Sequence, residues 1–253
     1  VLNGAKKIDN AVINNAVTEV SGNTLKLTYH PTTLKTAGIF VYGRKLNSNI
    51  TGGDGFPLPD EDFYISSVII RNNTIITPGD GITLSDARDC EVSGNTINGY
   101  NFSPDDKLRT SRDGIRIDQS SKNISVTGNE IKNMPRYGLY ITDNSTASAI
   151  ENNTFKNCTG TGIFLTDSSA CIYDIANNIV KNCKAGGILV GNNSRVTNIT
   201  GNAFGAVSGN PAIKVYSNSR TGLISTNRVR DMGDKTKATV ANAIEITGRS
   251  FAK

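Results

Sequence analysis

The residues best suited to chemistry gather around position 116. Arg116, Asp118 and Tyr140 supply a cation, a carboxylate and a phenol, and we take these three as candidate catalytic residues. Arg116 would neutralise a negative charge or act as a base, Tyr140 would donate a proton, and Asp118 would orient them. Asp118 with Asp113 or Asp143 also forms a carboxylate pair that would place a water for hydrolysis. The competing interpretation is a solvated loop with surface ion pairs.

The two carboxylates nearest this centre raise the question of a metal. Asp113 and Asp118 are candidate ligands of Ca²⁺, a cation that prefers oxygen ligands. They are predicted either to bind it or to orient the catalytic groups, and we assign no other cofactor.

Further cations and aromatic residues around this centre are candidate binding residues. Flat apolar rings beside charged hydrogen-bond donors suit a sugar chain, although exposed aromatic residues on a sheet also stabilise cross-strand packing. The predicted substrate-binding residues are Tyr42, Lys107, Arg109, Arg112, Phe164, Lys214 and Tyr216.

Composition narrows the class of partner. The 253 residues carry a net charge of +5, which favours anionic partners such as acidic polysaccharides. No run of Lys or Arg and no RNA-binding signature is present, so we expect no nucleic acid. No apolar run approaches the length of a membrane span, so we expect no membrane insertion. The chain begins with Val1 and shows no signal segment, so we expect a piece of a longer protein.

A repeat runs through most of the chain and must position these residues. The phrase "NNTFKNC" at Asn152 returns as "NNIVKNC" at Asn177, 25 residues later. Short runs with alternating apolar residues recur throughout, and each is followed by a segment that carries an Asn. The runs are "GIFVYG", "GITLSD", "GIRIDQ", "GLYITD", "GIFLTD", "GILVGN", "AIKVYS" and "AIEITG".

A repeat of this length predicts a solenoid. Alternation with period two indicates β-strands, and short strands bury their apolar faces only when successive repeats stack on each other. We therefore predict an all-β, single-stranded parallel β-helix of about 8–9 coils of about 24 residues. It would form one domain over residues 1–253, with an N-terminal part at 1–37, repeat coils at 38–248 and a tail at 249–253.

Residues at equivalent positions should form lines along the solenoid. The recurrent Asn is predicted to occupy one corner in a left-handed backbone conformation, with its amide bonded to the Asn of the next coil. Cys158 and Cys183 would lie one coil apart, either as stacked free thiols or as a disulfide. The strand-end row that includes Asp86, Gln119 and Asp143 is predicted to be a turn-capping ladder rather than a row of metal ligands.

Four insertions predict where a cleft would lie. They cover residues 25–37, 44–63, 99–113 and 230–242, and all of them flank the Gly-Ile-x-Leu strand. Loops on one side of a solenoid usually border its binding face. Alternation directs the side chains of Arg116 and Asp118 outward on that face, in columns with Tyr140, Phe164, Tyr42, Lys214 and Tyr216.

The "GIxL…GNxI" repeats resemble the right-handed parallel β-helix repeats of the pectate-lyase-like superfamily over about residues 38–248. The resemblance implies a right-handed solenoid and an extracellular or cell-surface protein. It also implies binding, and in an enzyme the cleavage or epimerisation, of an acidic polysaccharide, with a polysaccharide lyase favoured. The alternatives are a non-catalytic adhesin and a phage tailspike fragment; we expect a monomer, or a trimer in the tailspike case. The "DPHD" and "GHG" motifs of some members are absent.

Overall fold

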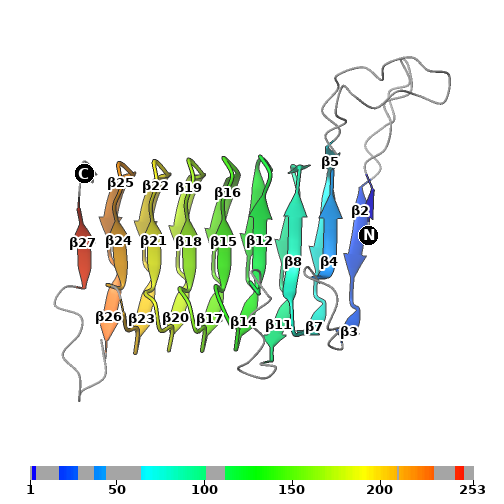
Figure 1. The fold of residues 1–253 in the computed structure, drawn as a ribbon, viewed down its shortest axis with the longest axis horizontal. Helices are drawn as coiled ribbons and strands as arrows, with labels where there is room; N and C mark the ends of the chain where they lie inside the picture. Colours follow the sequence, from blue (N-terminus) through cyan, green and yellow to red (C-terminus); the bar gives the residue numbers. More distant parts are fainter. Residues whose placement is uncertain are drawn as a thin grey trace, which may run out of the picture.

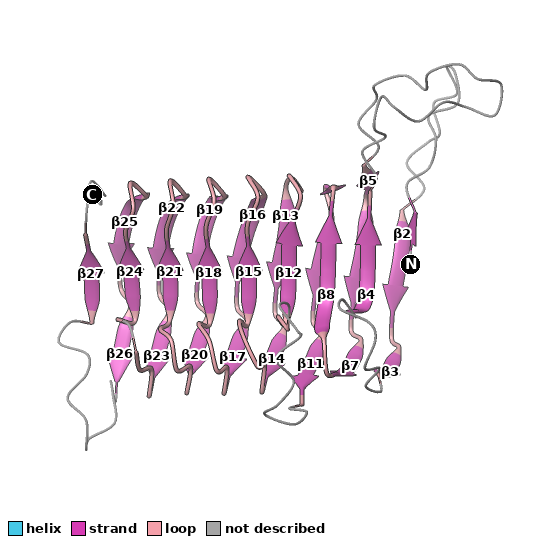
Figure 2. Cartoon of the chain, in the orientation of Figure 1, coloured by secondary structure: helices cyan, strands magenta, loops and turns pink. Residues whose placement is uncertain are grey.

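The chain folds into a stack of β-coils (Figure 1). The computed structural model describes residues 2–3, 17–27, 37–43, 64–100, 112–209, 211–230 and 243–247. Within these ranges every regular element is a β-strand, as Figure 2 shows. The strands β2 and β27 lie at opposite ends of the stack, so the coils advance steadily along one axis (Figure 1).

Three long parallel sheets form the sides of the solenoid. Sheet A has nine strands: β1 (Leu2–Asn3), β4 (Ala37–Tyr42), β8 (Asp80–Ser85), β12 (Ile115–Asp118), β15 (Leu139–Ile141), β18 (Ile163–Leu165), β21 (Ile188–Val190), β24 (Ile213–Val215) and β27 (Ile244–Ile246). Sheet B has eight: β2 (Thr18–Ser21), β6 (Val68–Arg71), β10 (Glu91–Ser93), β13 (Ile124–Thr127), β16 (Thr146–Glu151), β19 (Ala170–Ala176), β22 (Arg195–Thr200) and β25 (Arg220–Ser225). Sheet C has eight: β3 (Thr24–Lys26), β7 (Thr74–Thr77), β11 (Thr96–Gly99), β14 (Glu130–Lys132), β17 (Thr154–Lys156), β20 (Ile179–Lys181), β23 (Ala203–Gly205) and β26 (Arg228–Arg230). Two short strands, β5 (Ile65–Ser66) and β9 (Ala87–Arg88), pair with each other.

These sheets confirm the predicted all-β parallel β-helix of about 8–9 coils. The stacking begins before residue 38, because β2 pairs with β6 and β3 pairs with β7. Residues 248–253 lie outside the described residues, and the division of the chain into domains stays a prediction.

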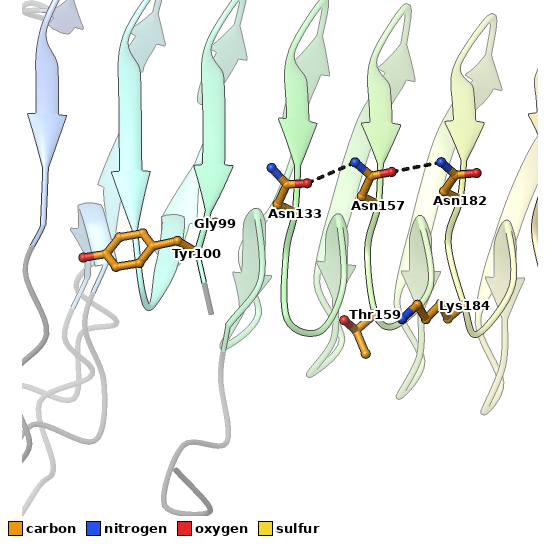
Figure 3. A pocket seen from close by; sticks show the side chains of 7 residues that line it. All are labelled: Gly99, Tyr100, Asn133, Asn157, Thr159, Asn182 and Lys184. Carbon is orange, nitrogen blue, oxygen red and sulfur yellow. Dashed lines mark hydrogen bonds between the residues drawn. The ribbon is translucent and has the colours of Figure 1, made fainter. Parts of the chain in front are cut away.

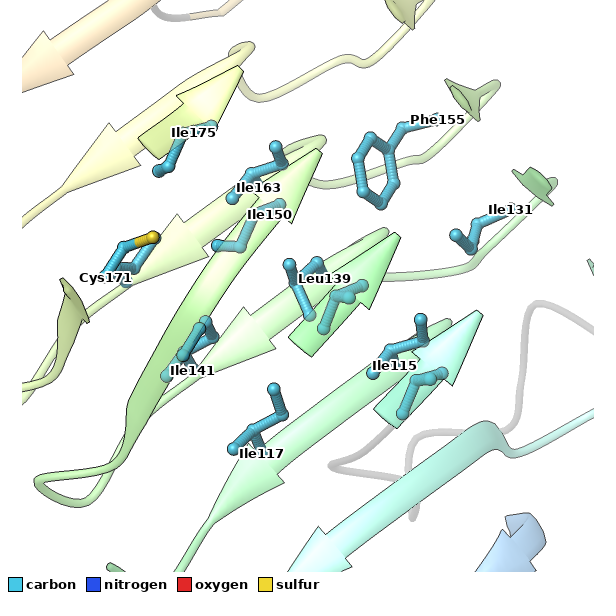
Figure 4. Packing of buried hydrophobic residues seen from close by; sticks show 14 of the residues in the cluster. Ile115, Ile117, Ile131, Leu139, Ile141, Ile150, Phe155, Ile163, Cys171 and Ile175 are labelled. Carbon is cyan, nitrogen blue, oxygen red and sulfur yellow. The ribbon is translucent and has the colours of Figure 1, made fainter. Parts of the chain in front are cut away.

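Alternating Ile, Val and Leu side chains fill the interior (Figure 4). Ile115 and Ile117 are fully buried, and so are Leu139 and Ile141 at the same positions one coil later. Burying such a side chain contributes about 1.5–3 kcal/mol, and each coil repeats the arrangement. Because the inward positions are taken by Ile and Leu, the residues between them must point outward from sheet A.

The glycine at the start of most sheet A strands is favoured by close packing, whereas Ala212 and Ala243 stand at this position in the last two coils. A Cβ on Gly114 would lie 2.3 Å from Ile131 Cγ2 and 2.5 Å from the Gly138 carbonyl oxygen. At Gly114 the turn between sheets C and A therefore brings two coils too close for a side chain.

The recurrent asparagines form a buried ladder between sheets B and C. In this inner ladder each Asn Nδ2 donates to the Oδ1 of the next Asn over 2.9 to 3.0 Å, through Asn23, Asn73, Asn95, Asn129, Asn153, Asn178, Asn202 and Asn227. The predicted ladder is thus confirmed, and Asn153, Asn178 and Asn202 share one edge.

The predicted backbone conformation of these asparagines is wrong. The left-handed residue is the one before the ladder Asn, for example Asn152 with a φ of 57° and Gly128 with a φ of 65°. The preceding residue turns the chain, and the ladder Asn can therefore direct its amide inward.

The cysteines are buried and unlinked. Cys90, Cys158, Cys171 and Cys183 are all free thiols, so the predicted alternative of a disulfide between Cys158 and Cys183 is not formed. The hydrogen bond to Cys183 and burial together raise the pKa of the Cys158 thiol, which keeps it protonated.

Candidate functional site

The outer face of sheet A carries the predicted column of outward side chains. Strand pairing places Arg116 beside Tyr140, Tyr140 beside Phe164, and Phe164 beside Leu189. Phe40, Thr83, Lys214 and Glu245 continue the same column in the other coils. The sequence period therefore predicted correctly which side chains are neighbours on this face.

Three aromatic rings form a cluster near the middle of this face. We call Tyr137, Tyr140 and Phe164 the aromatic platform. The Tyr137 and Tyr140 ring centroids are 5.0 Å apart, and Phe164 lies 5.3 Å from Tyr137 and 5.7 Å from Tyr140. All three side chains are half-buried, so each ring is only partly covered by its neighbours. These separations are typical of favourable aromatic pairs.

Two arginines border the aromatic platform. The guanidinium carbon of Arg116 lies 5.1 Å from the Tyr140 ring centroid, and that of Arg136 lies 4.9 Å from the centroids of both tyrosine rings. Contacts of this length allow cation–π attraction. The result is a cationic and aromatic surface on three adjacent coils.

Buried carboxylates hold the arginines in place. Arg116 Nε donates to Asp118 Oδ2 over 2.6 Å, and Arg116 Nη1 lies 3.5 Å from Asp113 Oδ2. Arg136 Nε donates to Asp113 Oδ1 over 2.8 Å, and Arg136 Nη2 pairs with Asp113 Oδ2. The Asp113 side chain is fully buried. The competing interpretation of solvated surface ion pairs therefore does not hold for Asp113, whose ion pair with Arg136 is buried on the Asp113 side.

The charges of this network perturb its titration. Burial alone would lower the pKa of Arg116, but the hydrogen bond and charge of Asp118 outweigh it, and the pKa rises. Arg136 behaves in the same way beside Asp113. Both guanidinium groups therefore stay protonated, which favours Arg116 as a neutralising cation over Arg116 as a base.

A third carboxyl group completes the network. Asp80 Oδ1 accepts the backbone N–H of Asp113 over 2.6 Å, and Asp80 Oδ2 accepts the Thr83 hydroxyl over 3.3 Å. Burial and the charge of Asp113 raise the pKa of Asp80 to about 7. Near neutral pH the Asp80 carboxyl group is therefore partly protonated, close to two ionised carboxylates and two guanidinium groups.

Alternation predicts a second outward column two residues further along each strand, formed by Tyr42, Ser85, Asp118, Thr142, Thr166, Gly191, Tyr216 and Thr247. Its predicted exposure is wrong for most of its members. Asp118 is only 4% exposed, and Ser85, Thr142 and Thr166 are equally buried. Arg116 donates to the Asp118 carboxylate from the sheet face, and the Ser85 hydroxyl donates to it from the neighbouring coil. These side chains point away from the core, as the alternation predicts. Longer neighbouring side chains cover them and form hydrogen bonds with them, so they are not exposed to solvent.

The strand-end row lies at turns, as predicted. Asp86, Gln119, Asp143 and Asp167 have φ angles of 49°, 51°, 55° and 53°. Asp143 is exposed, unlike the buried Asp118.

Calcium does not fit the predicted pair of ligands. Each of the two carboxylates, Asp113 and Asp118, is bonded to an arginine, whereas Ca²⁺ takes six to eight oxygen ligands. Within the described ranges there is also no group of three or more His, Cys, Asp or Glu residues suited to a metal ion.

The remaining predicted binding residues are spread along sheet A. Tyr42 stacks on Phe40 with centroids 5.4 Å apart. Lys214 Nζ pairs with Glu245 over 3.0 Å and lies 5.7 Å from the Tyr216 ring centroid. Arg112 is half-buried next to Asp113 in the chain. Lys107 and Arg109 lie outside the described residues.

The insertions adjoin sheet A as predicted. Segments 28–36, 101–111 and 231–242 connect a sheet C strand to a sheet A strand, and segment 44–63 follows β4 of sheet A. These four segments themselves lie outside the described residues.

Sequence reasoning missed Arg136, Tyr137 and Asp80. Tyr137 and Asp80 stand one position before the glycine that opens a sheet A strand, where Asp113 also stands. The sequence does contain a signal, in "PRYG" and "GDG". The residue directly before the glycine is Asp80, Asp113 or Tyr137 in three of the repeats, and each of these has a side chain that can ionise or donate a hydrogen bond. The predicted columns of outward side chains began at the glycine of each repeat, so they did not include the residue before it.

Comparison with known proteins agrees with this architecture. Among the described residues there is no helix that is long and apolar enough to cross a membrane. No curated protein and no solved structure matches the chain. The family model described as "Right handed beta helix region" matches residues 11–229, which confirms the predicted fold and its hand. The chain therefore belongs to the family of right-handed β-helix proteins.

Proposed function

We propose that the outer face of sheet A binds an anionic polysaccharide at the cell surface or outside the cell. The observation that carries the proposal is the aromatic platform with Arg116 and Arg136 at its border. Sugar rings pack on flat aromatic faces, and guanidinium groups recognise carboxylates. The net charge of +5 favours the same class of partner.

Arg116 is the residue best placed to meet an acidic group of the ligand. In the described part of the chain it uses Nε and Nη1 for the two aspartates. A guanidinium has five N–H donors, so Nη2 is left for an incoming carboxylate. The aspartates fix the orientation of the arginine, which lowers the entropy that binding would cost.

A binding assay with matched variants tests this proposal. The probe is polygalacturonate, with neutral cellulose oligosaccharides as the comparison, measured by affinity electrophoresis and calorimetry. Tyr140→Ala and Phe164→Ala should each weaken binding roughly 3- to 10-fold, the equivalent of losing about 0.5–1.5 kcal/mol of ring contact. Tyr173→Ala is the control, because Tyr173 is 63% exposed on sheet B.

Two results would contradict the proposal. One is polygalacturonate binding that Tyr173→Ala weakens as much as the platform variants do. The other is an absence of binding by every polyuronate tested, including alginate and heparosan. A monomer in sedimentation is expected, whereas a trimer would favour the tailspike alternative.

Cleavage or epimerisation of the bound chain is a second candidate function. It is supported by the convergence of Asp80, Asp113 and Asp118 on Arg116, which brings proton carriers and a neutralising cation together. Incubation with polygalacturonate tests it, with ultraviolet absorbance to detect elimination, a reducing-end assay to detect hydrolysis and proton NMR to detect epimerisation. Product formed equally by the wild type and Arg116→Gln would exclude this centre.

A further inference from the structure

A groove on another part of the solenoid lies beside a second row of asparagines. It has a volume of about 340 Å³ and is lined by Gly99, Tyr100, Asn133, Asn157, Thr159, Asn182 and Lys184 (Figure 3). This size is at the lower end of the range for small-molecule sites. The groove lies where the chain leaves sheet C, so it is separate from the aromatic platform on the face of sheet A.

The row of asparagines forms an outer ladder that is exposed to solvent. Its members are Asn98, Asn133, Asn157 and Asn182, joined by Nδ2 to Oδ1 bonds of 2.7, 3.0 and 3.0 Å. Asn133, Asn157 and Asn182 have φ angles of 58°, 56° and 54°, so each turns the chain and presents its own amide outward. Figure 3 shows the three amides in one line along the groove.

Each amide of the outer ladder has hydrogen-bonding capacity left over. An amide has two N–H donors and an oxygen with two lone pairs, and the ladder uses one donor and one lone pair. Asn157 donates to Asn133 and accepts from Asn182, and these are its side-chain bonds within the described ranges. One donor and one acceptor therefore recur from coil to coil along the outer ladder, about 4.8 Å apart.

The other lining residues indicate the charge of a ligand. Lys184 is exposed, and its side chain extends toward Thr159 on the side of the groove opposite the amides (Figure 3). Tyr100 lies at one end of the groove, and its hydroxyl donates to the Leu27 carbonyl. Among the described residues of the lining there is no Asp or Glu, so their field favours an anion near Lys184.

We infer that this groove binds a short carboxylate-bearing oligosaccharide of two or three pyranose units. Paired donors and acceptors complement the vicinal hydroxyls of a pyranose. The length of one pyranose unit along a sugar chain is also close to the distance between neighbouring coils. Three amides then contact two or three successive sugar units. Lys184 pairs with a carboxylate on the unit nearest to it. The inference does not depend on the function proposed for sheet A.

Side-chain amide spectra test the inference at the atoms concerned. The protein is labelled with ¹⁵N-asparagine and titrated with trigalacturonate, with cellotriose as the neutral comparison. The Nδ2 signals of Asn133, Asn157 and Asn182 are assigned by loss of one signal in each Asn→Gly variant. We expect saturable shifts of these three signals with trigalacturonate and weaker shifts with cellotriose.

Two variants and a matched control sharpen the test. Asn157→Gly removes the central amide, and glycine accepts its left-handed φ, so the fold should persist. It should weaken binding roughly 3- to 10-fold, the usual effect of losing one or two hydrogen bonds. Lys184→Gln should bring the affinity for trigalacturonate down to that for cellotriose. Asn152→Gly, exposed with a φ of 57° at another corner, should leave binding unchanged.

The outcomes separate this site from the one on sheet A. Tyr140→Ala should leave the groove signals and their titration unchanged, whatever it does to polymer binding. The inference is overturned if the three signals do not shift saturably, if Asn157→Gly binds as well as the wild type, or if Asn152→Gly weakens binding equally.

Discussion

The inner asparagine ladder allows a sharp test of how the coils are held in register. In Asn153→Ala the side chain loses four hydrogen bonds. Asn153 Nδ2 donates to the Val126 carbonyl over 2.9 Å and to Asn178 Oδ1 over 3.0 Å. Its Oδ1 accepts the backbone N–H of Asn129 over 2.9 Å and Asn129 Nδ2 over 3.0 Å. Asn153 is fully buried, so water cannot easily replace them.

The magnitude follows from these four bonds. Three of them contribute about 1 kcal/mol net each, and loss of the fourth leaves a buried N–H without an acceptor, which costs about 1–3 kcal/mol. Asn129 keeps other acceptors for its Nδ2 but loses the acceptor of its backbone N–H. We therefore expect the free energy of unfolding to fall by about 4–6 kcal/mol.

Urea denaturation followed by far-ultraviolet circular dichroism measures this change. The control is Asn152→Gly, one residue earlier, because glycine stands at the same corner in Gly94, Gly128 and Gly201 and suits the left-handed φ. We expect its free energy of unfolding to change by less than about 0.5 kcal/mol. A loss of less than about 1 kcal/mol in Asn153→Ala, with an unchanged denaturant slope, would refute the ladder as a main source of stability.

Three further predictions concern packing, pH and thiol access. Gly114→Ala should destabilise the fold by about 1–3 kcal/mol or more in thermal unfolding, because its Cβ would overlap Ile131 and a backbone carbonyl, whereas Gly205→Ala meets only one contact at 3.9 Å and should be tolerated. The pKa of Asp80 rises from 3.8 to about 7 on folding, so the folded state binds more protons between these values and stability should fall as pH increases from about 4 to 7. Asp80→Asn should flatten this decline in urea titrations, and an equally steep decline in the variant would contradict the assignment. All four buried cysteines should react slowly with Ellman's reagent in the native state and rapidly in guanidinium chloride, and fast native labelling of all four would contradict their burial.

The sequence by itself determined the fold and much of the site's layout. A repeat of about 24 residues leaves only stacking as a way to bury the apolar residues, and stacking in register makes equivalent residues neighbours. For this reason the contact between Tyr140 and Phe164 and the Asn153–Asn178 bond were predictable from letter positions alone.

Only the tertiary structure decided what surrounds each outward side chain. Alternation gives the side of the sheet on which Asp118 lies, but its burial depends on Arg116 and Ser85, which bond to it from the same strand and from the next coil. Likewise, Arg136 and Tyr137 precede the strand, and the path of the turn decides that they join the platform. A repeat period fixes positions along the coil, whereas burial, ion pairing and pKa depend on how side chains of neighbouring coils fill the remaining space.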